Sequence, residues 1–516
     1  MNEYILTLDL GTQSARAIIF DKNGSILAKD KQEYHPTYIP SENGLCEQDP
    51  NVYFQYLVTA TKNVVSKHPE LVKNVKGVVA TTFRDTAVFL DKDMKVLRPS
   101  ILWLDQRISS YIPHLPVWKK VLFWIVGMTP VINANQQKTM AHWVKANEED
   151  IWNKTYKYVN ISTYVNYLIT GKLKDTASNL TGHYPIDYKK GEYYKKNNIK
   201  YGVFDIPSRL NCEIVKPGDI IGYTNESFSK ATGIPTGLPV YGAGSDKSCE
   251  SLGNGCTDSS MASISYGTAS TIAITSKKYV EPSAFLPAYP SIQKGFYNSE
   301  LQIYRGYWML NWFKDEFCAN ESLEAGIQNI ATLDIMNQKM LSIGPGSEGL
   351  ILQPYWGPSL ERPNSRGAII GFSEKHHKIH LYRAIIEGIA FCLREGKERI
   401  EKKGRFKIES LAVSGGGAIS PAICQITADI FGLKVKRIHT FETSSLGAAM
   451  LGFISNGTYK DAEEAKKYMV HYETEFLPND ENHKKYNYLY KNVYVKLFPQ
   501  LKRTYTTLRE YTGEKL

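Results

Sequence analysis

The fold of this chain is decided by one stretch of sequence, Ile5-Leu6-Thr7-Leu8-Asp9-Leu10-Gly11-Thr12-Gln13-Ser14-Ala15-Arg16-Ala17-Ile18-Ile19-Phe20, because a second version of it follows midway. That version is Ser263-Ile264-Ser265-Tyr266-Gly267-Thr268-Ala269-Ser270-Thr271-Ile272-Ala273-Ile274. Each copy predicts an apolar strand, a Gly-Thr-x-Ser turn and a second apolar strand, since glycine permits the tight or positive-φ geometry between close strands. Hydroxyls and backbone N–H groups at two facing tips would grip a polyphosphate. The repeat therefore predicts a two-domain phosphotransferase.

Length and composition indicate two large α/β domains. The chain is 42% hydrophobic and 22% charged, which is ordinary for a globular protein. Its 516 residues are too many for one hydrophobic core, so we expect domains at 1–256 and 257–516. The net charge of +10 is spread without a long basic run, so a solvated lysine-rich surface is expected and no nucleic-acid partner. Seven cysteines without Cys-x-x-Cys spacing favour a reducing, cytoplasmic setting. The apolar run at 121–127 is too short to cross a bilayer, so no membrane partner is expected.

Strand and helix signals alternate along both halves, which is typical of mixed sheets flanked by helices. Further strands are expected at 75–80, 87–90, 238–241 and 411–413, and helices at 50–67, 136–170, 378–403 and 421–431. The stretch 216–237, rich in glycine, proline and threonine, reads as loop. In the tail, Tyr486, Leu489, Val493 and Leu497 have the helical spacing of a packing face.

Two aspartates stand where strands are predicted to end. Asp9 ends the first apolar strand, where a buried carboxylate is costly without a partner. A divalent cation carried by a nucleotide would be such a partner, and a turn aspartate bonded to backbone N–H groups is the alternative. Asp246 follows the strand at 238–241 and precedes a helix start. It could accept the proton of a sugar or polyol hydroxyl that attacks a γ-phosphoryl group, or it could only cap the helix.

Three further places carry candidate binding residues. Arg84 and Asp85 could donate to and accept from the hydroxyls of a polyol, or form a surface ion pair contributing ~0–1 kcal/mol. Trp103 could offer an apolar wall to C–H faces or belong to the core. Between a strand and a helix, 415–417 is all glycine, which lets an adenine or α-phosphate approach the backbone, although many strand–helix turns are glycine-rich. The chain has neither a P-loop motif nor a His/Glu zinc motif.

The order of these pieces resembles the FGGY carbohydrate kinase family of the actin-like ATPase superfamily, over residues 4–455. The resemblance rests on five stretches and a late small-residue helix: Asp9–Arg16, Ile101–Arg107, Gly244–Asp246, Tyr266–Thr268, Ser414–Ala418 and Ser444–Ala449. It implies two actin-like, ribonuclease H-like domains with mixed sheets, and an ATP cleft between them.

The resemblance also implies ATP and Mg²⁺ as cofactors and assigns roles to residues. Asp246 is implied as the general base, with Asp9 and Asp246 beside Mg²⁺. The nucleotide is implied to contact Gly11, Thr12, Gln13, Ser14, Arg16, Gly267, Thr268, Gly306, Asn311, Gly416 and Gly417. The sugar is implied to contact Arg84, Asp85, Trp103, Asp246 and Lys247.

The substrate stays open at this point. Phe83-Arg84-Asp85-Thr86 resembles the Arg-Glu-Thr of glycerol kinases, yet Lys247 stands where those enzymes have glutamine and xylulose kinases usually have asparagine. Lys247 could pair with a sugar acid or could point away and pack its stem. Glycerol or polyol, pentulose, gluconate and autoinducer-2 kinases remain alternatives. From another class, an actin-like ATPase or a sugar-binding sensor without turnover remains, and a homodimer could form.

Overall fold

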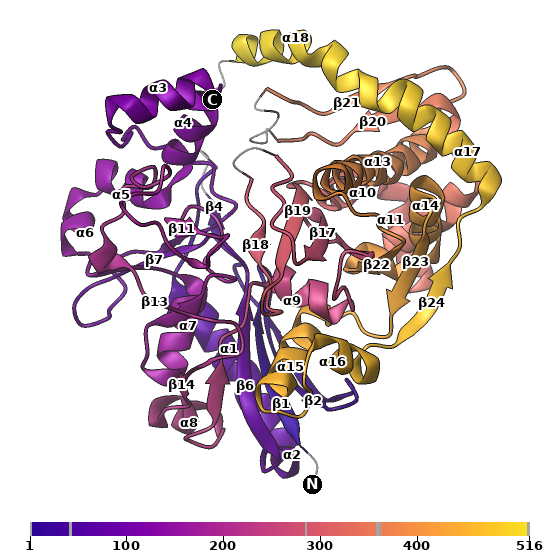
Figure 1. The fold of residues 1–516 in the computed structure, drawn as a ribbon. Coiled ribbons are helices and arrows are strands. Elements are labelled where there is room, and N and C mark those ends of the chain that lie inside the picture. Colours follow the sequence, from indigo (N-terminus) through magenta and orange to yellow (C-terminus); the bar gives the residue numbers. More distant parts are fainter. Residues whose placement is uncertain (1–2, 41–43, 284–285, 358–361, 363, 513–516) are drawn as a thin grey trace. The chain divides into compact units, whose positions relative to one another are not determined.

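The computed structural model describes residues 3–40, 44–283, 286–357, 362 and 364–512 (Figure 1). The chain forms two compact units, each built from discontinuous segments. Unit 1 comprises Met1–Thr257, Ala288–Asn298 and Glu442–Val470, and unit 2 comprises Asp258–Pro287, Ser299–Phe441 and His471–Leu516. The predicted division at 1–256 and 257–516 concerns domains and stays a prediction.

The first large sheet contains the first Gly-Thr hairpin. Its strand order is β14 (Ile220–Tyr223), β15 (Pro239–Tyr241), β6 (Val75–Thr82), β1 (Tyr4–Leu10), β2 (Ser14–Asp21) and β3 (Ile26–Glu33). β1 and β2 pair antiparallel with Leu10 opposite Ala15, which confirms the predicted hairpin. β6 runs parallel to β1 and to β15, so the sheet is mixed. The apolar residues of β1 are fully buried, because both faces of this strand are covered.

The second large sheet repeats this order from the opposite edge and adds one strand. It runs β18 (Tyr289–Pro290), β19 (Tyr297–Ile303), β17 (Ser270–Ser276), β16 (Met261–Tyr266), β22 (Ser410–Ser414), β23 (Lys434–Ile438) and β24 (Tyr472–Phe476). β16 and β17 pair antiparallel, β16, β22 and β23 are parallel, and β24 returns antiparallel, as β14 does in the first sheet. The two similar rounds expected from the sequence are therefore confirmed in the sheets.

Smaller sheets complete the strands. One has the order β4 (Ile39–Pro40), β5 (Cys46–Gln48), β8 (Ser100–Ile101), β7 (Ala87–Leu90) and β9 (Lys157–Asn160). Three two-stranded pairs are β10 (Lys174–Thr176) with β13 (Glu213–Val215), β11 (Ile186–Asp187) with β12 (Glu192–Tyr193), and β20 (Ile351–Gln353) with β21 (Ala368–Ile370).

The helices of unit 1 include two from late in the chain. They are α1 (Pro50–Lys67), α2 (Pro69–Val72), α3 (Val117–Ile125), α4 (Thr129–Lys138), α5 (Met140–Asn147), α6 (Glu149–Lys154), α7 (Ile161–Thr170), α8 (Glu226–Thr232), α9 (Asp246–Gly253), α15 (Thr443–Ser455) and α16 (Ala462–Met469). α1 starts as predicted, with Asp49 accepting from the Asn51 N–H at 2.9 Å and Pro50 as the first helical residue. In Figure 1, α15 lies beside β1 and β6 although it is coloured at the opposite end of the scale.

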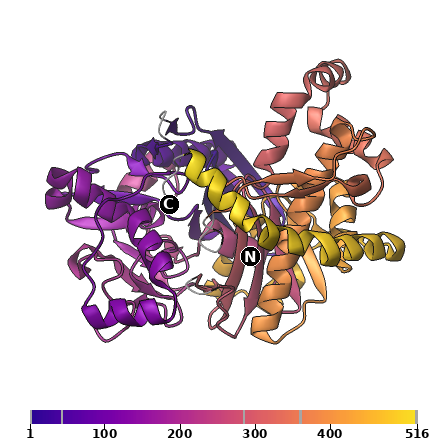
Figure 2. The ribbon, with the colours of Figure 1, turned by 90° about the horizontal axis from the view of Figure 1, so that it is seen from above.

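Unit 2 carries the remaining helices, α10 (Trp308–Phe317), α11 (Ala319–Gln328), α12 (Thr332–Lys339), α13 (Lys378–Gly404), α14 (Pro421–Phe431), α17 (Asp480–Leu489) and α18 (Val495–Thr512). A π-helical turn at Tyr490–Tyr494 joins α17 to α18, so the tail forms one long helical run, drawn in yellow in Figure 2. Tyr486 and Leu497 are buried, and Leu489 and Val493 pack against the same core, which confirms the predicted packing face.

Two stretches differ from their predicted structure. The stretch 136–170 is not helical throughout, because β9 interrupts it and pairs antiparallel with β7, with Val159 opposite Val88. Sheet pairing overrides the local pattern there. The stretch 216–237 is not a loop but holds β14 and α8. Its polar residues are caps: the Asn225 side chain accepts from the Phe228 N–H at 2.8 Å, and Gly233 ends α8 at φ 83°.

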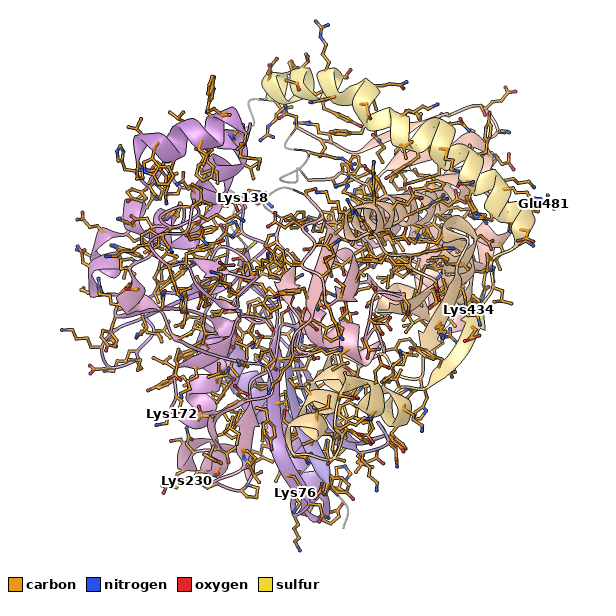
Figure 3. All side chains as sticks on the ribbon, in the orientation of Figure 1. Lys76, Lys138, Lys172, Lys230, Lys434 and Glu481 are labelled. Carbon is orange, nitrogen blue, oxygen red and sulfur yellow. The ribbon has the colours of Figure 1, made fainter. Side chains whose placement is uncertain are left out.

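The surface carries the excess of lysines. Lys76, Lys172 and Lys230 are exposed and project from the ribbon in Figure 3. The apolar run near 121–127 forms the second part of α3 and the turn that follows it, and Trp118 and Trp124 on this helix are exposed. Over the described part of the chain, no helix has the length and hydropathy needed to cross a bilayer.

Candidate active site

The first Gly-Thr tip joins two charged residues that lie directly opposite each other in the hairpin. Gly11 N–H donates to the Ser14 carbonyl at 3.0 Å, and a Cβ on Gly11 would lie 3.3 Å from that oxygen, so the turn is tight. Asp9 pairs with Arg16 across the strands, and the Arg16 Nη1 donates to Asp9 Oδ2 at 3.4 Å. In the second hairpin the equivalent pair is neutral, Ser265 opposite Thr271. The first tip alone therefore carries charge, as expected.

Asp9 is a buried carboxylate that pairs with Arg16 and has two further carboxylates, Glu442 and Asp246, near it. Its Oδ2 also accepts from the Ser445 Oγ at 3.2 Å, and Glu442 holds Arg16 at 3.3 Å and Lys29 at 2.7 Å. Burial raises the pKa of Asp9 to about 6. Arg16 and Ser445 act against this rise, and the carboxylates of Glu442 and Asp246 add to it. Asp9 and Asp246 thus offer oxygen ligands to a divalent cation that would relieve their repulsion.

Asp246 is the first residue of α9. Ser245 occupies the N-cap position, and the Asp246 Oδ1 accepts from the Lys247 N–H at 2.8 Å. The loop before Asp246 is held against β6, because the Thr81 Oγ1 donates to the Gly244 carbonyl at 3.0 Å. Burial raises the pKa of Asp246, although the positive charges of Lys247 and Arg84 oppose the rise. A carboxylate in this state is a stronger base than an exposed one.

Helix α9 is held against α15 by a reciprocal pair of glycines. A Cβ on Gly253 would lie 1.9 Å from the Thr443 carbonyl oxygen, and a Cβ on Gly447 would lie 1.9 Å from the Cys249 carbonyl oxygen. The two backbones therefore touch where no side chain fits. This crossing places Asp246 at the start of α9 and Ser445 on α15 within one unit.

Lys247 is engaged within its own helix. Its Nζ lies 2.7 Å from Oε2 of Glu250, whose side chain is almost fully buried. Burial acts to lower the pKa of Lys247, but the charges of Glu250 and Asp246 outweigh this and raise it, so the ammonium stays charged. The head group of Lys247 therefore pairs with a buried carboxylate of its own helix.

Arg84 and Asp85 each contact a different neighbouring residue in unit 1. The Arg84 guanidinium lies over the Tyr289 ring, 5.5 Å from its centroid. Asp85 adopts φ 49°, and both of its carboxylate oxygens contact His183, Oδ1 at 3.2 Å from the backbone nitrogen and Oδ2 at 2.9 Å from Nδ1. Two consecutive residues are thus each held by a different partner.

Trp103 lies beside the first tip. Its Nε1–H donates to the Thr12 Oγ1 at 3.3 Å, and the ring is only partly buried, so it is not simply a core residue. Next along the tip, Gln13 is exposed and its carbonyl accepts from the Tyr34 N–H at 3.0 Å, while Ser14 begins β2 as a buried residue. The predicted sugar wall and the predicted phosphate turn are therefore neighbours in unit 1.

The second tip, in unit 2, is backed by the turn into α10. The Tyr307 N–H donates to the Gly267 carbonyl at 3.1 Å, and the Trp308 N–H donates to the Thr268 carbonyl at 3.3 Å. A Cβ on Gly306 would lie 2.2 Å from the Ser270 Oγ, so this turn closes onto β17 without space for a side chain. Asn311 is exposed on α10, one turn of helix further on.

The glycine run lies against the same second tip. A Cβ on Gly415 would lie 2.7 Å from the Tyr266 carbonyl oxygen, and one on Gly417 would lie 2.3 Å from the Tyr307 ring. Gly416 differs, because it is exposed and a Cβ there would meet nothing within 4 Å. Of the predicted nucleotide residues of the second half, Gly267 and Gly417 thus contact Tyr266 or Tyr307.

Sequence reasoning missed four residues of this site: Glu442 and Ser445 beside Asp9, Glu250 beside Lys247, and His183 beside Asp85. The small-residue stretch Ser444–Ala449 was a signal for the helix that carries Ser445. His183 follows Gly182 in a stretch with no pattern typical of a site, so nothing in the sequence pointed to it.

Comparison with known proteins agrees with this geometry. Models of the N-terminal and C-terminal domains of the FGGY family of carbohydrate kinases match residues 4–253 and 262–455. The chain is 27% identical to the xylulose kinase of Bacillus subtilis over 503 residues (96% of this chain, 97% of that protein) and 25% identical to the gluconokinase of the same species over 531 residues (99% and 98%). Solved structures with the same fold include a xylulose kinase from Rhodospirillum rubrum, with a TM-score of 0.82 and 21% identity. They also include a gluconate kinase from Lactobacillus acidophilus, with a TM-score of 0.81 and 21% identity. Each comparison covers 98% of this chain and 100% of the other. The chain therefore belongs to the FGGY family of carbohydrate kinases, which are ATP-dependent phosphotransferases.

Proposed function

We propose that this kinase transfers the γ-phosphoryl group of ATP to a hydroxyl of a neutral sugar or polyol, with Asp246 as the general base. One observation carries the base assignment: Asp246 is a carboxylate of raised pKa at the start of α9, within electrostatic reach of both Arg84 and Asp9. The other carboxylates nearby are already engaged, Glu250 by Lys247 and Asp85 by His183.

In the proposed step, the sugar hydroxyl gives its proton to the Asp246 carboxylate as its oxygen attacks the γ-phosphorus. The bond between that phosphorus and the bridging oxygen of the β-phosphate breaks, and ADP leaves with the electron pair. The positive charges of Arg84 and Lys247 oppose the rise that burial causes in the pKa of Asp246 and so favour its ionised form before the step. A base of this kind contributes about 10²–10⁴ to the rate.

Sugar binding is assigned to Arg84, Asp85 and Trp103. Arg84 offers donors and Asp85 offers acceptors, which matches the paired needs of neighbouring hydroxyls. The Trp103 ring suits the C–H face of a sugar. Its hydrogen bond to Thr12 ties the position of the sugar to the first tip.

Nucleotide and metal roles are assigned unit by unit. In unit 1, Gly11, Thr12, Gln13, Ser14 and Arg16 would contact phosphate, and Asp9 and Asp246 would hold Mg²⁺ brought by ATP, most simply through water. The fit to Mg²⁺ rests on the buried Asp9 carboxylate, whose pKa the neighbouring charge of Asp246 helps to raise. Among the described residues, no group of three or more histidine, cysteine, aspartate or glutamate side chains is placed to hold a metal ion. In unit 2, Gly267, Thr268, Gly306, Asn311, Gly416 and Gly417 would contact the nucleotide.

A neutral sugar is favoured over a sugar acid by the charge around Asp246. Lys247, the cation that could have bound a carboxylate substrate, is paired with Glu250 at 2.7 Å. Of the residues assigned to the sugar, Arg84 is then the other cation, and its charge already acts on the carboxylates of Asp85 and Asp246. We therefore place pentuloses first, in agreement with the relatives named as xylulose kinases.

The test is ADP release measured over D-xylulose, D-ribulose, glycerol, D-gluconate and autoinducer-2, with wild type, Asp246→Asn and Asp93→Asn. Asp93 is exposed in a turn and serves as the matched control. We expect the best kcat/KM with a neutral sugar and a loss of about 10²–10⁴ in kcat for Asp246→Asn alone. Near-normal turnover of Asp246→Asn would remove the base assignment. ADP release that no sugar changes would favour an ATPase, and preference for gluconate would overturn the neutral-sugar class.

A further inference from the structure

The carboxylate of Asp85 is clasped at both oxygens by one residue that the reaction does not otherwise use. The His183 N–H donates to Oδ1 at 3.2 Å, and the His183 Nδ1 lies 2.9 Å from Oδ2. An ionised carboxylate only accepts hydrogen bonds, so Nδ1 carries the proton and donates. The clasp uses one lone pair on each oxygen and leaves the others free for hydroxyl donors. Asp85 itself has φ 49°, in the left-handed region that aspartate adopts more readily than most residues other than glycine.

Gly182 makes this approach possible. Its φ is 105°, and a Cβ at this position would lie 2.3 Å from Cγ and Oδ1 of Asp85. Any other residue would push the carboxylate away from His183. Gly182 and His183 therefore form the contact site of the Asp85 side chain.

The Gly182-His183 contact site is linked to Arg84 through the side chains of Tyr188 and Tyr289. The Tyr188 hydroxyl lies 2.8 Å from the Leu180 carbonyl oxygen and 3.4 Å from that of Gly182, which fixes the backbone on which His183 stands. The Tyr188 ring packs edge-on against Tyr289 at 5.0 Å between centroids, and Tyr289 lies under Arg84. One group of contacts thus supports both residues assigned to sugar binding.

We propose that His183 is a positioning residue for the sugar: it holds the Asp85 carboxylate in a fixed, acceptor-only orientation beside Arg84, with Gly182 and Tyr188 as its support. The proposal rests on the proposed role of Asp85 in sugar binding. His183 acts through Asp85, so it sets sugar affinity and selectivity for hydroxyl donors rather than the rate of phosphoryl transfer.

The charges that face this pair agree with such a role. Burial acts to raise the pKa of Asp85, yet His183, and to a smaller degree Arg84, hold it below the ordinary value. Tyr158 and Tyr184 also face Asp85, and His142 faces His183. Without the imidazole, Asp85 would lose its main counterweight to burial, and its carboxylate would protonate at a higher pH.

The test compares His183→Asn with His183→Gln, because only asparagine places an amide donor where Nδ1 stands. The probe is D-xylulose, or the sugar of the panel above with a higher kcat/KM. We expect His183→Gln to raise the sugar KM about tenfold or more, with kcat and the ATP KM nearly unchanged and with the acid limb of kcat/KM moved to higher pH. His183→Asn should recover most of the affinity. His68→Ala, at an exposed site, should change nothing.

Asp85→Ala and the double variant with His183→Gln separate the two assignments. If His183 acts through Asp85, the double variant binds sugar no worse than Asp85→Ala. An unchanged sugar KM in His183→Gln, with a raised one in Asp85→Ala, would overturn the positioning role and leave the sugar role of Asp85 intact. An unchanged KM in Asp85→Ala would overturn the sugar role of Asp85 and the proposal with it. Additive losses in the double variant would show that His183 acts on its own.

Discussion

The hydroxyl of Ser445 donates to the Asp9 carboxylate at 3.2 Å, although the two residues are 436 positions apart. Ser445 lies on α15, which belongs to unit 1 and packs beside β1 and α9. The carboxylate site at the first tip is therefore incomplete until a helix from the far end of the chain has docked.

Removing this hydroxyl should weaken the use of MgATP in acid. The Ser445 bond acts against the rise in the pKa of Asp9, so Ser445→Ala should raise that pKa further above about 6. Less carboxylate is then ionised near pH 6, and we expect the KM for MgATP to rise several-fold there and to approach wild type by pH 8. Ser444→Ala, at the neighbouring half-buried serine, is the control. An equal effect at pH 6 and pH 8 would contradict the link to Asp9.

The ionised carboxylate of Asp9 should lower the free energy of unfolding when no ligand is bound. Its pKa is higher in the folded protein, about 6 against an ordinary 3.8, so the folded state favours the protonated acid. The penalty is absent below about pH 4, grows between pH 4 and pH 6, and is complete above that range, at about 3 kcal/mol.

The variant Asp9→Asn should therefore unfold at higher denaturant than wild type at pH 8, with the difference shrinking as the pH falls toward 4, while kinase activity is lost. Denaturant unfolding without nucleotide, followed at several pH values, measures this. A stability difference that is the same at pH 4.5 and pH 8 would show that the carboxylate charge is not the cause.

Substitution of Lys247 and of Glu250 should shift the pH profile of kcat/KM for the sugar in opposite directions. The positive charge of Lys247 lowers the pKa of Asp246 and the negative charge of Glu250 raises it. Lys247→Gln should therefore move the acid limb of kcat/KM for the sugar to higher pH, and Glu250→Gln should move it to lower pH. Shifts of the same sign in both variants would indicate a general change in packing instead of an electrostatic effect on the base.

The crossing of α9 and α15 should tolerate no side chain. A Cβ on Gly447 would lie 1.9 Å from a backbone oxygen, which cannot move without shifting α9 and Asp246. Gly447→Ala should cost about 2–3 kcal/mol of unfolding free energy and lower kcat in the folded fraction. Gly326→Ala on α11, where a Cβ meets nothing within 4 Å, should instead stabilise by about 0.5–1 kcal/mol. Chemical denaturation compares the two, and equal effects would refute the close crossing.

The parts of the fold that could be predicted are those whose causes are local. The two hairpins are fixed by apolar runs on either side of a Gly-Thr turn, and α14 by Ser420, Pro421 and Gly432 at its ends. β9 was missed because four residues become a strand only through pairing with β7. In the site, Asp9 and Asp246 stood out as carboxylates at predicted strand ends. The contact of Asp85 with His183 spans 98 residues and depends on a positive φ and on Gly182, none of which leaves a periodic signal.

Two adjacent glycines should separate folding from nucleotide binding in unit 2. Gly417 faces Tyr307 and Tyr266 so closely that Gly417→Ala should destabilise unit 2, whereas Gly416 is exposed and has open space where a Cβ would go. Gly416→Ala should keep the wild-type melting temperature. If the nucleotide approaches this backbone as proposed, the new methyl group should raise the KM for ATP about fivefold to thirtyfold and leave the sugar KM unchanged, because the loss of close contact costs about 1–2 kcal/mol. Gly416→Ala with wild-type ATP kinetics would remove this turn from the nucleotide site, and a lowered melting temperature would mean that Gly416 is needed for packing after all.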